Sequence, residues 1–293
     1  MDENCAVPRA CMTPRRSVAR GPWLPIRPVA MDPARRFSKQ VLSGIIAGSL
    51  LWWLIVPRIL KAFYDRPEPT SCDSGWWGCE QNEFDRGFTE AAVFAPMATG
   101  LVSHVFTLVA CPVVAVHAVW SESAPQVAKH DLVVYAAAQM VTAGASSIAK
   151  DGFQRQRPCY YYGRSNETEG YLIDKVSAQE WKSFWSGDTS SGWSFVVAAV
   201  VLLHLRSRTD AARKVAVRGG ALATIGSLLR IAGFMHWLTD VLAGFVCGCL
   251  CGAGLPLLLW RACGGESAKV ETSVTERVLQ RESPLKTASE TVP

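Results

Sequence analysis

Residues 150–240 contain three polar clusters: Lys150-Asp-Gly-Phe-Gln-Arg-Gln-Arg157-Pro158, then Ser183-Phe-Trp-Ser186-Gly187-Asp188-Thr189-Ser190, then Arg230-Ile-Ala-Gly-Phe-Met-His236-Trp-Leu-Thr-Asp240. Each cluster stands at the end of an apolar segment. The chain has 293 residues, and 49% of them are hydrophobic. The apolar segments therefore predict the fold, and the clusters at their ends predict the functional site.

Six apolar segments have about the length that a helix needs to cross a bilayer, roughly 20 residues. They are residues 41–60, 91–119, 132–149, 190–205, 215–234 and 241–260. A backbone in lipid must satisfy its own hydrogen bonds, so we expect each segment to be a helix. The predicted fold is all-α, a six-helix transmembrane bundle. Pro96 and Pro112 are expected to kink the second helix.

Polar tails flank this apolar middle. We expect residues 1–40 to be a basic, disordered cytoplasmic tail, residues 41–260 the membrane core, and residues 261–293 a second disordered tail. The first tail lacks the apolar core of a secretory signal peptide. An organelle transit peptide is the alternative for residues 1–40, because such peptides are rich in Arg and poor in acidic residues.

The charges of the loops predict the orientation in the membrane. The loop after the fourth segment is basic, with Arg206, Arg208, Arg213, Lys214 and Arg218, whereas the loop after the first segment is acidic. The positive-inside rule then places both tails in the cytoplasm or its topological equivalent. The net charge of +5 comes from residues that flank apolar segments, so we do not expect a nucleic-acid partner.

Smaller features agree with that orientation. Cys72 and Cys79 lie in the first loop, where they would form a disulfide in an oxidising compartment or stay a free pair. The sequon at Asn166 lies in the third loop, on the same side. Three alternating cysteines in the sixth segment do not share a helix face, so we interpret them as packing residues and not as metal ligands. They are Cys247, Cys249 and Cys251.

This topology brings the three clusters to one side of the membrane. Lys150 follows the outward end of the third helix, and Asp188 precedes the outward start of the fourth. Arg230 and His236 lie at the outward end of the fifth, and Asp240 opens the sixth. We therefore expect one site on the lumenal or extracellular face.

The first cluster offers two cations. If the helix continues past Lys150, then Arg157 lies two turns later on nearly the same face, and Pro158 ends the element. Two such cations can bind phosphate oxygens, Arg in bidentate fashion and Lys as a point charge. The alternative is that both side chains only snorkel from a helix end.

The other two clusters add an anion site and a nucleophile. Ser186 and Gly187 precede a helix start, where free backbone amides bind anions, although simple capping is the alternative. If His236 and Asp240 share a helical turn, the carboxylate can hold one ring nitrogen and leave the other as a nucleophile. Arg230 could then neutralise a developing oxyanion.

The three clusters resemble the type 2 phosphatidic acid phosphatase superfamily, integral-membrane lipid phosphate phosphatases. Its motifs are Lys, six residues, Arg-Pro; then Pro-Ser-Gly-His; then Ser-Arg, five residues, His, three residues, Asp. Lys150, Arg157 and Pro158 match the first motif, and Arg230, His236 and Asp240 match the spacing of the third. The chain departs from the family at three positions: Trp185 replaces proline, Asp188 replaces histidine, and Leu229 replaces serine.

The resemblance implies a mechanism. His236 would attack phosphorus to form a phosphohistidine, and Asp240 would orient it. The phosphoryl oxygens would be held by Lys150, Arg157, Ser186, Gly187 and Arg230. Asp188 would take the place of the family's proton donor. An aspartate donates a proton only when protonated, and its ordinary pKa is about 3.9.

Two hypotheses about function follow. In the first, the chain is an active, metal-independent phosphatase with no cofactor, acting on phosphatidate-like lipids or polyprenyl pyrophosphates. In the second, it is a catalytically impaired relative that binds phospholipids or partner proteins. The motifs favour the first, because all of Lys150, Arg157, Arg230, His236 and Asp240 are present. They carry no information on oligomeric state.

Overall fold

The computed structural model describes residues 39–63, 83–92, 95, 101–164 and 180–281. The predictions for residues 1–38, for the pair Cys72 and Cys79, for the sequon at Asn166 and for residues 282–293 lie outside the described residues. Every described helix belongs to one compact unit, Asp32–Pro293. Within the described ranges the regular structure is helical, without strands, so the prediction of an all-α bundle is confirmed.

Six helical stretches are long and apolar enough to cross a membrane. The helices are α1 (Lys39–Leu54), α2 (Val56–Phe63), α3 (Glu83–Ala91), α4 (Leu101–His104), α5 (Cys111–Glu122), α6 (Pro125–Phe153), α7 (Pro158–Tyr161), α9 (Gly187–Leu205), α10 (Thr209–Ala232) and α11 (Leu238–Arg281). The six stretches correspond to the six apolar segments of the sequence, as in an integral membrane protein. The last span, Leu238–Ala262, ends close to the expected residue 260, but α11 continues to Arg281, into residues that we expected to form a disordered tail.

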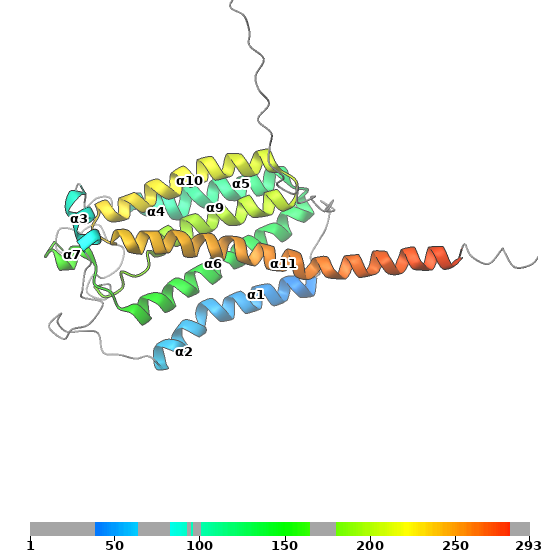
Figure 1. Ribbon diagram of the computed structural model, residues 1–293, viewed down its shortest axis with the longest axis horizontal. Coiled ribbons are helices and arrows are strands. Elements are labelled where there is room, and N and C mark those ends of the chain that lie inside the picture. Colours follow the sequence, from blue (N-terminus) through cyan, green and yellow to red (C-terminus); the bar gives the residue numbers. More distant parts are fainter. Residues whose placement is uncertain (1–38, 64–82, 93–94, 96–100, 165–179, 282–293) are drawn as a thin grey trace, which may run out of the picture. The chain divides into compact units, whose positions relative to one another are not determined.

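Helix α9 is the centre of the bundle. It contacts α5, α6, α10 and α11, and Figure 1 shows it between α10 and α11. Its buried side chains, among them Val196, Leu202 and Leu203, pack with Val134 of α6 into the apolar core. The N-terminus of this central helix carries Gly187 and Asp188 of the middle cluster.

Glycines allow α11 to approach α9 closely. A Cβ atom added at Gly248 would lie 2.4 Å from the Ser190 carbonyl oxygen, and one at Gly244 would lie 2.6 Å from the Ser186 carbonyl oxygen. Gly252 lies one turn further along α11, and a Cβ atom there would lie 2.8 Å from the Ser194 carbonyl oxygen of α9. Small residues at such a spacing let transmembrane helices pack backbone to backbone. This contact holds Asp240 of α11 beside the start of α9.

The second apolar segment is irregular at Pro112, where a kink was predicted. A π-helical turn, η3 (Val105–Ala110), separates α4 from α5, and Pro112 stands in the first turn of α5. The Cys111 amide bonds to the Phe106 carbonyl, five residues earlier. Proline lacks an amide hydrogen and clashes with the preceding turn, which widens the helix there. Pro96 lies outside the described residues.

A buried ion pair closes the end of the bundle that is remote from the clusters. Arg206, after α9, donates two hydrogen bonds to Asp131 of α6, at 2.7 and 3.1 Å. The Arg206 guanidinium also lies 4.9 Å from the ring centre of Trp260 in α11. Two charges buried together in bidentate geometry satisfy each other and join three helices.

Candidate active site

The predicted site residues lie at helix ends that meet at one end of the bundle (Figure 1). Lys150 is in the last turn of α6, and Gly187 and Asp188 open α9. Arg230 is in the last turn of α10, and Asp240 is in the first turn of α11. The antiparallel order of the helices thus brings together residues that are up to 90 positions apart.

The expectation of one continuous helix from Lys150 to Arg157 is wrong. α6 ends at Phe153, and Gln154 takes a left-handed backbone conformation with φ of 44°. Arg157 is extended and precedes Pro158, which begins α7 instead of ending a helix. The physical reason is that proline suits the first position of a helix, where its missing amide hydrogen costs nothing. The charges of Lys150 and Arg157 still interact electrostatically.

The Lys150 ammonium lies against the start of α9. A Cβ atom at Gly187 would be 3.0 Å from Lys150 Nζ, so glycine leaves room for the cation. Among the described residues, the ammonium has neither a hydrogen bond nor an ion pair. The first backbone amides of a helix have no carbonyl partner within the helix, and together with a nearby cation they form a binding site for an anion.

Ser186 caps α9 and keeps a donor for another group. Its Oγ accepts from the Thr189 amide at 3.4 Å and from the Thr189 hydroxyl at 3.0 Å. A hydroxyl has two acceptor positions and one hydrogen, so the Ser186 O–H points away from these two donors. The Ser186 amide donates to the Asp240 carbonyl at 3.0 Å and ties the cap to α11.

His236 lies in the turn between α10 and α11, so it does not share a helical turn with Asp240 as we expected. Its Nδ1 is 2.7 Å from the Ser183 carbonyl oxygen and 3.8 Å from Asp240 Oδ2. Both oxygens accept, so Nδ1 carries the hydrogen. The neutral ring then has its lone pair on Nε2, for which no described residue is a hydrogen-bond partner. Nε2 is the nitrogen available for attack.

The charge state of His236 suits a nucleophile. Burial lowers its pKa from the ordinary 6.5 to about 3. Asp240 opposes this shift, whereas the positive charges of Arg157 and Arg230 add to it. The side chain is 1% exposed, so the imidazolium would lose almost all of its hydration. His236 is therefore neutral at physiological pH.

The Asp240 carboxylate lies near His236 and accepts hydrogen bonds from three other groups. Oδ2 accepts from the Trp237 amide at 3.0 Å and from the Ser183 hydroxyl at 2.5 Å. Oδ1 accepts from Arg155 Nη1 at 2.7 Å. The bond to Trp237 is that of a capping box, in which the third helical residue bonds to the cap amide. The start of α11 thus fixes the carboxylate next to the histidine.

Arg155 links Asp240 to a second buried carboxylate. Its Nη2 donates to Asp85 of α3 at 2.7 Å. Asp85 Oδ1 in turn accepts from the Thr239 amide at 2.9 Å. Motif reasoning did not single out Arg155 or Asp85. A signal existed for Arg155, which stands inside the first cluster, but only the acidity of the first loop pointed to Asp85.

Asp188 does not stand alone at the position of the family's histidine. Its Oδ2 lies 2.9 Å from Arg230 Nε, and its Oδ1 lies 3.6 Å from Nε2 of His104 in α4. Arg230 also donates to the Ser103 hydroxyl at 3.2 Å. His104 was missed by sequence reasoning. The available signal was a histidine inside the second apolar segment, residues 91–119, which carries no Lys, Arg, Asp or Glu.

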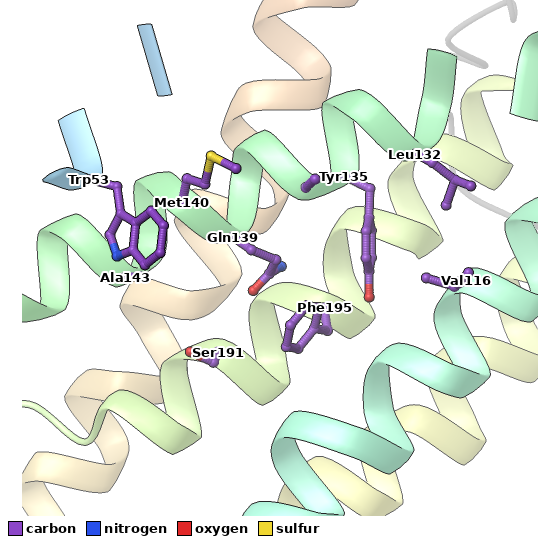
Figure 2. A pocket seen from close by; sticks show the side chains of 10 residues that line it. Trp53, Val116, Leu132, Tyr135, Gln139, Met140, Ala143, Ser191 and Phe195 are labelled. Carbon is purple, nitrogen blue, oxygen red and sulfur yellow. The ribbon is translucent and has the colours of Figure 1, made fainter. Parts of the chain in front are cut away.

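An apolar groove of about 570 Å³ runs along the bundle below this end. Its walls come from α1, α5, α6 and α9 (Figure 2). Figure 2 shows Tyr135, Gln139 and Phe195 turned into it, with Ser191 at one end. Ala143 precedes Lys150 by seven residues, or about 10 Å along α6. Ser191 follows Gly187 by one turn of α9, so the groove begins beneath the polar site.

A family model described as the PAP2 superfamily matches residues 131–262, a range that contains all three clusters. Comparison with curated proteins and with solved structures gave no match. The family match supports phosphatase activity on phosphate esters. This match confirms, over residues 131–262, the resemblance of the three motifs to the type 2 phosphatidic acid phosphatase superfamily.

Proposed function

We propose that this protein is a membrane phosphatase that hydrolyses lipid phosphates through a phosphohistidine intermediate. The observation that carries the proposal is the setting of His236, a buried neutral histidine whose Nδ1 is held and whose Nε2 is available. The end of the bundle around it also contains the cations Lys150, Arg157 and Arg230. A nucleophile among cations suits phosphoryl transfer better than it suits passive packing.

In the first step, His236 Nε2 forms a bond to phosphorus as the bond to the leaving oxygen breaks. The hydrogen remains on His236 Nδ1 and keeps its hydrogen bond to the Ser183 carbonyl oxygen. The nearby Asp240 carboxylate stabilises the positive charge that develops on the ring. In the second step, water attacks the phosphohistidine and releases inorganic phosphate. His236 returns to its neutral state with the same hydrogen on Nδ1.

The phosphoryl oxygens are bound by side chains and amides of this chain. Lys150 and the guanidinium groups of Arg157 and Arg230 supply positive charge. The Ser186 hydroxyl and the Gly187 amide add donors at the N-terminus of α9. These groups can stabilise the charge on the transferring phosphoryl group without a metal ion in the scheme.

The apolar groove supports a lipid as the substrate. A phosphate at Lys150 places the attached chain first against Ser191 and Ala143, and then deeper along α6 and α9. The lining is apolar except for groups such as Gln139 and the Tyr135 hydroxyl. A hydrocarbon chain, acyl or prenyl, matches such a lining, whereas a sugar phosphate would leave its hydroxyl groups unsatisfied there.

The loop charges support a site on the lumenal or extracellular side. Arg206 and the basic residues that follow it lie at the end of the bundle remote from His236. Positive loops stay in the cytoplasm, which puts the polar site on the opposite side. The substrate phosphate would then be in the outer or lumenal leaflet.

One observation favours a second candidate, a lipid-binding relative without turnover. Asp188 replaces the family's histidine and pairs with Arg230 at 2.9 Å, so one cation of the site already has a carboxylate beside it. In this reading the site binds a phosphate headgroup and releases it unchanged. The two candidates differ in whether inorganic phosphate forms.

The test is phosphate release by the full chain purified in detergent, with phosphatidate, lysophosphatidate and a polyprenyl pyrophosphate. We expect the wild type to release phosphate and to show an acid-labile phosphoenzyme after rapid quenching. His236→Ala should lose both, with a rate at least about 10⁴-fold lower, because the variant has no nucleophile. His117→Ala, at an exposed histidine of α5, is the matched control. Wild-type turnover no faster than that of His236→Ala on every substrate would reject the phosphatase and leave the lipid-binding candidate.

A further inference from the structure

His104 is a histidine of the site that lies outside the three motifs. It precedes the region that matches the family model, and it comes from α4, which packs on α10. Its Nε2 is 3.6 Å from Asp188 Oδ1, and its side chain is 25% exposed. The position that holds a histidine in the family is therefore an aspartate with a histidine beside it.

Two consecutive residues of α4 contact the site. Ser103 accepts a hydrogen bond from Arg230, and His104 faces Asp188. The close approach of this segment to α10 depends on Gly226, where a Cβ atom would lie 2.4 Å from Thr107 Cγ2 and 3.4 Å from the Ser103 carbonyl oxygen. The packing of α4 and η3 on α10 thus brings His104 next to Asp188 and Arg230, at the proposed phosphate-binding site.

Asp188 is poorly suited to donate a proton itself. An arginine at 2.9 Å favours the ionised carboxylate, and an ionised carboxylate only accepts hydrogen bonds. The cations Lys150 and Arg230 and the residue His236 also interact electrostatically with Asp188. A carboxylate in these surroundings can hold an imidazolium, as a carboxylate does for the histidine of a catalytic triad.

We propose that His104 donates the proton to the leaving-group oxygen, and that Asp188 is the positioning residue that holds the His104 ring. This inference rests on the proposed phosphatase function. As the bond from His236 Nε2 to phosphorus forms and the bond from phosphorus to the leaving oxygen breaks, a ring N–H of the His104 imidazolium protonates that oxygen. The neutral ring then takes a proton from the water that attacks the phosphohistidine, so His104 ends the cycle as it began.

The test compares two leaving groups. The alkoxide that leaves an alkyl ester such as phosphatidate needs a proton. The group that leaves 4-nitrophenyl phosphate is a stable phenolate, which needs none. His104→Gln should lower kcat for phosphatidate by about 100-fold or more, the usual contribution of a general acid. It should leave kcat for 4-nitrophenyl phosphate almost unchanged. His117→Gln should leave both substrates unaffected.

Asp188→Asn provides a second, independent variant, which also serves if His104→Gln does not fold. We expect a selective loss on phosphatidate that is smaller than that of His104→Gln, because the ring is retained but less well held. An equal loss on both esters, or no loss on either, in folded variants would overturn the role of His104. If instead the wild type releases phosphate from neither ester, the proposed phosphatase function has failed, and the inference fails with it.

Discussion

At the scale of the residue, the chemistry depends on which nitrogen of His236 is held. The Ser183 carbonyl is closer to Nδ1 than the Asp240 carboxylate is, at 2.7 Å against 3.8 Å. Asp240 is itself held by Arg155 and by the Ser183 hydroxyl. Ser183 thus bonds to both members of the pair, through its backbone and its side chain. It positions the histidine and the carboxylate together.

The neutral state of His236 predicts a pH dependence of stability. Its pKa is about 3 in the folded protein and near 6.5 when unfolded, so between these values the unfolded chain binds more protons. The free energy of unfolding must then fall as the pH falls below 6.5. Between pH 7 and 5.5, we expect His236 to contribute a loss on the order of 1 kcal/mol, a loss that His236→Gln should lack.

This pH dependence can be measured by unfolding the purified protein in detergent at several pH values. His117→Gln is the control for removing a histidine that is exposed. The decisive quantity is the difference in pH dependence between the wild type and His236→Gln. Parallel curves for these two proteins would mean that His236 takes up its proton over the same pH range in the folded and unfolded states, which would contradict the lowering of its pKa by burial.

At the scale of the element, the site depends on how closely α11 packs on α9. Gly244, Gly248 and Gly252 face backbone atoms at the start of α9 and along it, and a side chain at any of these three positions would collide with that backbone. The same pair of helices carries Ser186 and Asp240, which are joined by a backbone hydrogen bond of 3.0 Å. Helix packing in the membrane therefore sets the distance between the anion site and the nucleophile.

Gly248→Ala should separate the two helices. The added Cβ would lie 2.4 Å from the Ser190 carbonyl oxygen, so the backbone has to move. We expect a loss of about 1–3 kcal/mol in the free energy of unfolding, the usual cost of overpacking, and a lower rate of phosphate release. Thermal unfolding in detergent and the phosphatase assay would measure the two effects.

Gly254 provides the control for this prediction. It lies in the same helix, and a Cβ atom there would have no neighbour within 4 Å. Gly254→Ala should be neutral or slightly stabilising, because alanine favours a helix over glycine by about 1 kcal/mol. Equal melting temperatures for the Gly248 and Gly254 variants would contradict the close packing of α9 and α11.

At the scale of the whole molecule, the polar site and the apolar groove lie one after the other along the same two helices, α6 and α9. α6 contributes Lys150 to the first and Ala143 to the second, and α9 contributes Gly187 and Ser191. A lipid phosphate has the same order of parts, a charged headgroup followed by a chain. The arrangement of helices thus matches the substrate class as well as the reaction.

Ala143→Phe should test this match by filling the groove. Excluding two methylene groups of the chain costs about 1.6 kcal/mol, so we expect KM for a long-chain phosphatidate to rise by about 10-fold. The kinetics of a water-soluble, short-chain phosphate ester should not change. Val217→Phe, on the exposed face of α10, is the control. If KM rose equally for the long-chain and short-chain esters, the groove would not be the site of the chain.

The sequence by itself determined the six apolar helices and the residue types at their outward ends. Hydropathy and short spacings are properties of single segments, so they can be interpreted before any packing is known. The wrong prediction that Pro158 ends a continuous helix also has a local cause, because proline begins a helix as readily as it ends one. The same three clusters were sufficient to indicate the family.

Only the tertiary structure decided how those residues are held. Ser183 and His236 are 53 residues apart, and Arg155 and Asp240 are 85 apart. His104 and Asp188 meet across α4 and α9, and no motif joins them. Such pairs depend on which helices pack together and at what rotation, which the pattern within one segment does not contain. The neutral His236 is likewise a result of burial by all the surrounding elements.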